Sequence, residues 1–261
     1  MSPTNTARSR TVDIQHLTHA GSLAMRLIGP ASDSATVLLR GGQLVSWVNA
    51  QGREMLHAGA LPWGSALRLR CGGLSLRLPH QAQDGPLAYL SGTQHADWRV
   101  HDAWFHRGVP HLSLCLHSPS AGNASRPHEV ACYLDMVLHS PQLLVALKVV
   151  NLGQQALQFS AAMQPCFRQV SASAGRWTAA PGAVSLPCAD GQLELSAGGF
   201  ADVALWSPWL QQDRGALRAG VAQGAGLVCF DAATRCQSTA LAPGSQWLGT
   251  QRMRWNAQPP L

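Results

Sequence analysis

Short runs of alternating apolar and polar residues recur along most of the chain, and turn residues separate them. A period of two is typical of a strand with one buried face. The glycine, proline and asparagine residues between the runs are typical of turns. We expect strands at residues 11–17, 24–28, 35–39, 43–48, 67–70, 98–105, 129–139, 143–151, 155–163, 202–206, 227–231 and 246–255.

Two of these segments indicate how the strands are buried. In residues 43–48, odd-numbered side chains fall on one face and even-numbered side chains on the other. Residues 143–150 are apolar on both faces apart from Lys148, as in an inner strand between two layers. A helical stripe occurs at residues 205–217, but proline and glycine interrupt it. Many short strands with almost no helix favour an all-β sandwich or barrel.

Length and composition are consistent with one globular domain. A chain of 261 residues is within the range of a single all-β domain, so we expect residues 1–261 to form one domain. We expect residues 1–10 to be flexible and residues 118–127 to form a mobile loop. Hydrophobic residues make up 46% of the chain and charged residues 12%, which excludes a disordered chain.

The charge pattern bears on the partners of the protein. The formal charge is +6, but the arginines are scattered and Lys148 is the only lysine, so we expect no nucleic-acid partner. The pair Arg68 and Arg70 suits a small anionic ligand such as a sugar phosphate. We expect no membrane segment, because no apolar run reaches the about 20 residues that a membrane helix needs. We also expect no signal peptide after the polar residues 1–10.

The cysteines and histidines predict neither disulfides nor a metal site. Seven cysteines without a CxxC pair indicate reduced thiols in the core, which favours a cytoplasmic protein. His101, His106 and His111 are five residues apart, which places neighbours on opposite faces of a strand. Zinc-protease, phosphate-loop and dinucleotide motifs are absent from the sequence. We therefore expect no metal and no other cofactor.

Three parts of the chain carry more specific motifs. The first reads GGQLVSW at residues 41–47 and LRCGGLSLRLP at 69–79. The second reads VVNLGQQALQFSAAMQPCF at 149–167. The third reads VALWSPW at 203–209, LVCFD at 227–231 and LAPGSQWLG at 241–249. In this order they resemble the hexose-6-phosphate mutarotase branch of the aldose 1-epimerase family. The resemblance implies a large antiparallel β-sandwich of the galactose mutarotase-like (supersandwich) type.

The resemblance also implies a sugar pocket, with departures at its catalytic positions. Gln164 stands where the family has a histidine, and Cys166 where it has a tyrosine. Asp231 stands where the family has a glutamate, and His95 is the histidine nearest to a second missing motif. The implied catalytic positions are therefore Asp231, Gln164 and His95. The implied substrate-binding residues are Arg70, Arg168, Trp98, Trp206 and Trp209.

These departures predict weak or absent mutarotase activity with a standard substrate. Mutarotation needs a base that deprotonates the anomeric hydroxyl and an acid that protonates the ring oxygen. Asp231 is one methylene shorter than glutamate, and a displacement of about 1 Å can cost about 100-fold in rate. Gln164 can donate a hydrogen bond but cannot release a proton at neutral pH. Loss of general acid catalysis typically removes about 10²–10⁴-fold.

Three hypotheses follow for the function. The chain is a divergent sugar or sugar-phosphate 1-epimerase with a relocated acid such as His95 or His80. Alternatively, it is a catalytically silent relative that binds a carbohydrate or a protein partner. The third hypothesis is an unrelated β-sandwich interaction domain. The first two require Arg70, Gln164 and Asp231 to meet at one site.

Overall fold

The computed structural model describes residues 12–57, 72–78, 96–118, 129–168, 183–188, 190–206, 227–234 and 240–258. Predictions that fall entirely on other residues, such as the strand at 67–70, lie outside this part of the chain. So does the predicted loop after Ser118, the last residue of a strand.

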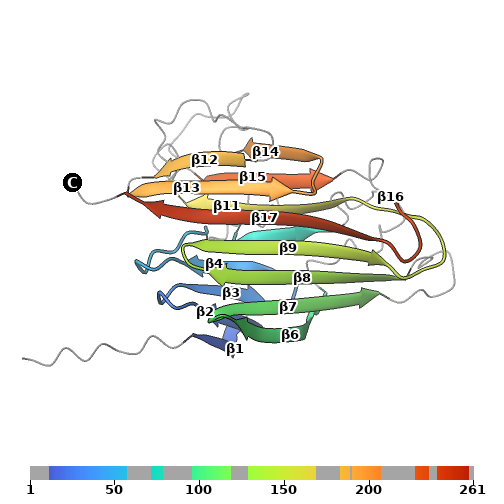
Figure 1. Ribbon diagram of the computed structural model, residues 1–261, viewed down its shortest axis with the longest axis horizontal. Coiled ribbons are helices and arrows are strands. Elements are labelled where there is room, and N and C mark those ends of the chain that lie inside the picture. The colour runs from blue at the N-terminus through green and yellow to red at the C-terminus, as the bar shows by residue number, and fades with distance from the viewer. Residues whose placement is uncertain are drawn as a thin grey trace, which may run out of the picture.

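Two large antiparallel sheets face each other and confirm the predicted all-β sandwich (Figure 1). In spatial order, the eight-stranded sheet contains β1 (Asp13–His19), β2 (Ser22–Ile28), β3 (Ser34–Leu38), β4 (Leu44–Val48), β5 (Leu74–Arg77), β11 (Ala161–Arg168), β15 (Leu227–Thr234) and β14 (Asp202–Trp206). The seven-stranded sheet contains β12 (Ala183–Cys188), β13 (Gly191–Gly198), β17 (Gln246–Ala257), β9 (Gln142–Asn151), β8 (Val130–His139), β7 (Val109–Ser118) and β6 (Arg99–His106). A small third sheet pairs β10 (Leu157–Gln158) with β16 (Ala240–Leu241).

The core lies between the two large sheets and follows the alternation of the strands. In β9, every second side chain from Leu143 to Val149 is buried, and the side chains between them are half-buried. The apolar residues on the second face of this strand therefore do not mark a second buried layer. Lys148 lies on that outer face, with its ammonium group 4.3 Å from the centre of the Tyr133 ring.

Strand β4 departs from strict alternation. Leu44 and Trp47 are both 1% exposed and both belong to the core, although they are three residues apart. The pairing of β3 with β4 shifts register between Thr36 and Val37, which is a β-bulge or a similar irregularity. Such an irregularity re-aims side chains. The predicted division of residues 43–48 into two regular faces was therefore wrong.

The histidines of β6 and β7 also differ from expectation. His106 and His111 are close neighbours, with ring centres 6.3 Å apart, and Trp104 stacks on His111 at 5.0 Å. A tight turn at Arg107–Gly108 reverses the chain between them, so spacing along one strand does not apply. The prediction that His106 and His111 lie on opposite faces was wrong.

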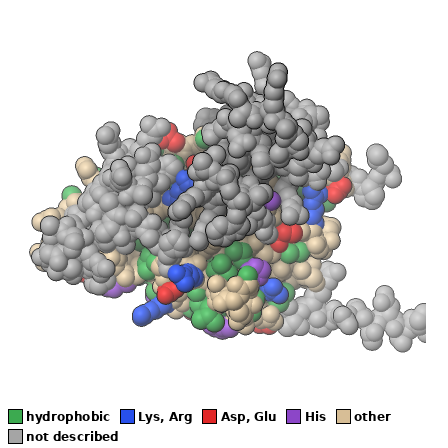
Figure 2. Space-filling model, turned by 180° about the vertical axis from the view of Figure 1, so that it is seen from behind, with side chains coloured by type: hydrophobic (Ala, Val, Ile, Leu, Met, Phe, Trp, Pro, Cys, Tyr) green, Lys and Arg blue, Asp and Glu red, His purple; other side chains and the backbone are tan. Residues whose placement is uncertain are grey.

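One face of the molecule shows mixed charge among the described residues. In the view from behind, basic and acidic side chains of the described residues are interspersed with apolar ones (Figure 2). In the described part of the chain, no helix is long and apolar enough to span a membrane.

A buried side chain links the two large sheets. Gln251 of β17 is 1% exposed, and its Nε2 donates a hydrogen bond of 2.8 Å to the carbonyl oxygen of Met163 in β11. An amide buried in an apolar core is stable only when it is hydrogen-bonded. This bond therefore ties β17 to the strand that carries Gln164.

Candidate functional site

Gln164 and Asp231 occupy facing positions on neighbouring strands. The antiparallel register of β11 and β15 pairs Met163 with Ala232 and Cys166 with Cys229. The same register continues between these pairs and sets Gln164 opposite Asp231. Directly opposed residues in an antiparallel pair project to the same face, with Cβ atoms about 4.5–5.5 Å apart. The structure thus brings together the two positions that sequence reasoning placed at the centre of the site.

This pair lies on the face of the eight-stranded sheet that points away from the core. Met163 and Phe167 of β11 belong to the core between the sheets, as does Phe230 of β15. Because successive side chains of a strand alternate, Gln164 and Asp231 project to the other face. Gln164 is nevertheless only 3% exposed, while Asp231 is half-buried. Residues 161–167 of β11 are therefore buried on both faces, and Gln164 places a polar group among apolar neighbours.

Only the oxygen of the Gln164 side-chain amide has a hydrogen-bond partner among the described residues. Nη2 of Arg77, on the adjacent strand β5, donates a hydrogen bond of 2.8 Å to Oε1 of Gln164. The buried Nε2 of Gln164 has no hydrogen-bond partner among the described residues. An unsatisfied buried donor costs about 1–3 kcal/mol, so such an atom is a candidate contact for a ligand.

Pro165 interrupts the pairing of β11 with β15 beside this pair, although β11 itself continues through it. Proline has no N–H and removes one ladder hydrogen bond when it lies inside a sheet. The positions of Gln164 and Pro165 are those at which the β11–β15 pairing is broken, between Met163 and Cys166. The backbone irregularity therefore coincides with the candidate site.

Cys166 and Cys229 form a disulfide between β11 and β15. They are opposed in register on the same face as Gln164 and Asp231, and their Cα atoms are 4.2 Å apart. The prediction that all cysteines are reduced core thiols was wrong for these two, because register brings them into direct contact. Cys132 is a free buried thiol, and burial raises its pKa to about 12.

His57 lies on the same face and was missed by sequence reasoning. Its backbone N–H donates to the carbonyl of Cys166 at 2.8 Å, and Leu56 bridges Phe167 in the antiparallel sense. Leu56 is in the core, so the next residue projects to the outer face with Cys166. Gly73 joins this arrangement, since its N–H donates to His57 and its carbonyl accepts from Cys166.

The signals for the missed residues are local and short. Arg77 is the last residue of the alternating stretch 74–77, in which Leu74 and Leu76 are buried and Ser75 and Arg77 are half-buried. His57 follows Leu56 in the same way, directly after a buried strand-like residue. Alternation alone could have placed both on an outer face, but not beside Gln164.

The remaining predicted site residues have mixed outcomes. Arg70, His95 and Trp209 lie outside the described residues, as does His80. Arg168 ends β11 and Trp206 ends β14, where only the backbone is described. Trp98 is 2% exposed in the core between the sheets, with its ring packed beside Gly42. The structure therefore assigns Trp98 to the core, on the opposite side of the sheet from the Gln164–Asp231 face.

Glu54, which lies between β4 and His57, has a structural role. One of its oxygens accepts hydrogen bonds from the backbone N–H groups of Trp47 at 2.8 Å and Leu56 at 3.0 Å. The other accepts from the hydroxyl of Ser46 at 2.5 Å. Three donors hold this carboxylate, so it fixes the segment that carries His57.

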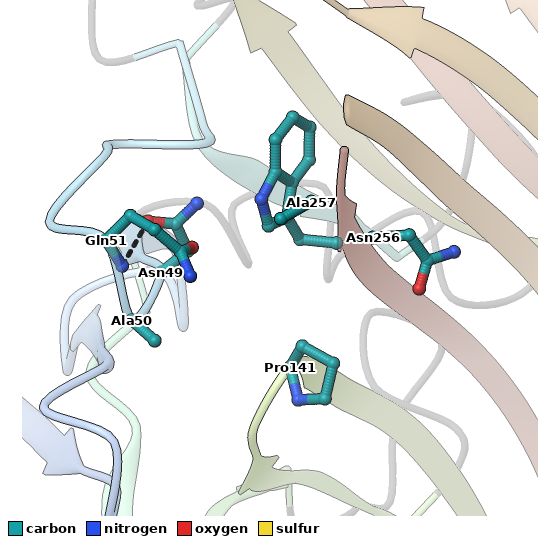
Figure 3. A pocket seen from close by; sticks show the side chains of 7 residues that line it. Asn49, Ala50, Gln51, Pro141, Asn256 and Ala257 are labelled. Carbon is teal, nitrogen blue, oxygen red and sulfur yellow. Dashed lines mark hydrogen bonds between the residues drawn. The ribbon is translucent and has the colours of Figure 1, made fainter. Parts of the chain in front are cut away.

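A separate hollow of about 320 Å³ lies at one end of the sandwich (Figure 3). It is bounded by the turn at Asn49–Gln51, by Pro141, and by the end of β17 at Trp255–Ala257. Its described lining contains no titratable side chain, so it offers no acid–base chemistry. Among the described residues, no group of three or more histidine, cysteine or acidic side chains is arranged to hold a metal ion.

Known structures share this architecture. A galactose mutarotase-like protein from Clostridium acetobutylicum matches with a TM-score of 0.69 at 12% identity, covering 95% of this chain and 99% of that one. Galactose 1-epimerase from Lactobacillus acidophilus matches with a TM-score of 0.65 at 13% identity, covering 95% and 100%. A putative mutarotase from Salmonella typhimurium gives 0.64 at 14% identity, covering 94% of each chain.

These matches establish the fold. The chain is an antiparallel β-sandwich of the galactose mutarotase-like type, as the sequence motifs predicted. The shared fold agrees with what the sequence resemblance implied, whereas the third hypothesis implied no particular β-sandwich. No protein-family model matches the sequence, and no curated protein matches it.

Proposed function

We propose that this protein binds a hexose or a hexose 6-phosphate at the outer face of β5, β11 and β15. The observation that carries the proposal is the facing pair Gln164 and Asp231, with a buried amide N–H of Gln164 that has no partner among the described residues. The fold supports it, because galactose 1-epimerase from Lactobacillus acidophilus has the same architecture.

The two side chains complement the anomeric centre of a cyclic sugar. A hemiacetal carries a ring oxygen, which only accepts hydrogen bonds, and a neighbouring hydroxyl, which also donates. The Gln164 amide supplies a donor, and a carboxylate at Asp231 supplies an acceptor. A few placed polar groups of this kind fix the orientation of a ligand in a site. Arg70, by its sequence resemblance, is proposed to contribute to binding a phosphate on the sugar.

Binding without efficient catalysis is the function that these residues support best. Gln164 cannot transfer a proton, and Asp231 is shorter than the glutamate of the family. We therefore expect a silent or very slow relative of the mutarotases that retains the sugar site.

A slow 1-epimerase is the second candidate, and His57 favours it. Imidazole titrates near neutral pH and can act as a general acid. In this reaction Asp231 takes the proton of the anomeric hydroxyl while the protonated His57 gives its proton to the ring oxygen. The bond between the anomeric carbon and the ring oxygen breaks, and a free aldehyde forms. The aldehyde rotates, and the reverse proton transfers close the ring on its other face.

Two measurements on the full chain test these functions. Titration calorimetry with glucose 6-phosphate, glucose and galactose measures binding, and we expect saturable binding that Asp231→Ala weakens. Polarimetry or NMR on freshly dissolved α-glucose 6-phosphate and α-galactose measures the return to anomeric equilibrium. Acceleration above buffer that is lost in Asp231→Ala would support the epimerase. Absence of binding across the sugar panel would refute the proposed function.

A further inference from the structure

We infer that Arg77 is a positioning residue that fixes the Gln164 amide with its NH₂ group directed to the ligand, so that this position only donates. The inference rests on the proposed function for the nature of the ligand. The orientation of the amide itself rests on the structure alone.

The orientation follows from the chemistry of the two side chains. A guanidinium group has five N–H donors and no acceptor. Nη2 of Arg77 lies 2.8 Å from the Gln164 side-chain amide, so the atom that faces it must be the carbonyl oxygen. Rotating the amide by half a turn would set two donors against each other. Arg77 therefore decides which end of the amide is left for a ligand.

The strand register explains how Arg77 reaches Gln164. Arg77 pairs with Ala162 and Ser75 pairs with Gln164 in the register of β5 and β11. Arg77 thus approaches Gln164 diagonally from the adjacent strand on the same face, a distance that long side chains span. The half-buried guanidinium makes a charge-assisted hydrogen bond, which is about twice as strong as a neutral one.

A donor-only position selects the ligand. It favours a ligand atom with a lone pair, such as a ring oxygen, because that atom can accept the hydrogen bond. It disfavours a ligand group that must itself donate a hydrogen bond at this point. A cyclic sugar meets this requirement, whereas its carba analogue, with a methylene in place of the ring oxygen, does not. A site built to hydrogen-bond a ligand atom discriminates strongly against the analogue that lacks it.

The first experiment needs no ligand. In ¹⁵N-labelled protein, the side-chain NH₂ signals of Gln164 are assigned by their loss in Gln164→Met. We expect Arg77→Met to shift these signals and to accelerate their exchange with water several-fold. Arg26→Met is the matched control, because Arg26 also bonds across strands of this sheet, to Thr36 at 3.2 Å, and should leave the signals unchanged. Unchanged signals in Arg77→Met would overturn the inference.

The second experiment measures specificity. The dissociation constants of glucose 6-phosphate and of its carba analogue are compared in the wild type and in Arg77→Met. We expect the wild type to prefer the sugar by at least about tenfold, and Arg77→Met to lose most of that preference because its amide can rotate. Retained preference in Arg77→Met would overturn the inference. A wild type that binds neither compound would refute the proposed function instead, and the NH₂ signals would still decide the role of Arg77.

Discussion

The disulfide between Cys166 and Cys229 lies next to the pair Gln164 and Asp231, two residues away along each of β11 and β15 and on the same face of the sheet. It joins the two strands that carry the candidate site, beside the point at which Pro165 interrupts their hydrogen bonds. The covalent bond therefore holds the strands together where the backbone ladder is incomplete.

Removal of this disulfide should destabilise the fold. The two cysteines are 63 residues apart, and a disulfide that closes a loop of this size typically contributes about 2–4 kcal/mol. We expect the double variant Cys166→Ala, Cys229→Ala to lose about that much free energy of unfolding in urea. Cys115→Ala, at a free half-buried cysteine, is the control and should lose far less. Peptide mapping that finds Cys166 and Cys229 unlinked would contradict the disulfide itself.

Gln164→His should raise the rate of anomer interconversion. An imidazole at this position supplies the general acid that glutamine lacks, and such a group contributes up to about 10²–10⁴-fold. The positive charge of Arg77 disfavours a protonated histidine, so Gln164→His combined with Arg77→Met should be faster still. Polarimetry on α-glucose 6-phosphate measures both rates. Gln164→Asn is the control, and an equal gain in that variant would argue against acid catalysis.

His57→Gln should remove any acid catalysis that the wild type retains. If the slow epimerase is correct, the rate falls and its dependence on pH near neutrality is lost, while sugar affinity changes little. His16→Gln, on the distant strand β1, serves as the control. A wild-type rate that survives in His57→Gln with the same pH profile would exclude His57 as the proton donor.

His111 should titrate below an ordinary histidine. Burial, followed by the nearby charge of His106, lowers the pKa of His111 below 6.5. The unfolded chain therefore binds this proton more readily than the folded chain. Well above pH 6.5, His111 does not lower the free energy of unfolding. As the pH falls through 6.5, His111 lowers the free energy of unfolding progressively, and this effect levels off below the pKa of His111 in the folded protein. NMR titration should show His106→Gln raising the pKa of His111, and an unchanged value would contradict the Coulombic contribution.

Gly73→Ala should lower the free energy of unfolding, because Gly73 lies in the segment that holds His57 and Cys166. Gly73 has a φ of +64°, and an added Cβ would collide with the backbone carbonyl of Leu44. Gly21→Ala is the matched control, because Gly21 has a φ of +79° but open space around it. We expect the control to lose about 1–2 kcal/mol from backbone strain alone. Equal losses in urea unfolding would show that the collision near Leu44 is relieved without cost.

Local patterns predicted the bounds of some strands closely, whereas β7 and β13 were not predicted. Strand β14 has the bounds that its alternating residues predicted, and β9 differs from its prediction by one residue. Strand β5 was missed because four residues carry little periodic signal. The single strand predicted at residues 155–163 corresponds to two elements, β10 and the start of β11. The residue pattern of a strand continues through 159–160, so it did not reveal the break there.

Only those residues of the candidate site that belong to a family motif could be predicted from the sequence. The resemblance singled out Gln164 and Asp231, and the register of β11 and β15 places them together. Arg77 and His57 join them only through pairings between distant segments, which no local pattern encodes. The same holds for the disulfide, since a choice among seven cysteines requires the strand register.

The hydrogen bond from Gln251 to the Met163 carbonyl gives the seven-stranded sheet a mechanical connection to the candidate site. Met163 precedes Gln164 directly, so a displacement of β17 would be transmitted to the amide through a single peptide unit. If the proposed sugar site is correct, we therefore expect substitutions in the seven-stranded sheet to change sugar affinity without touching the surface where the sugar is proposed to bind.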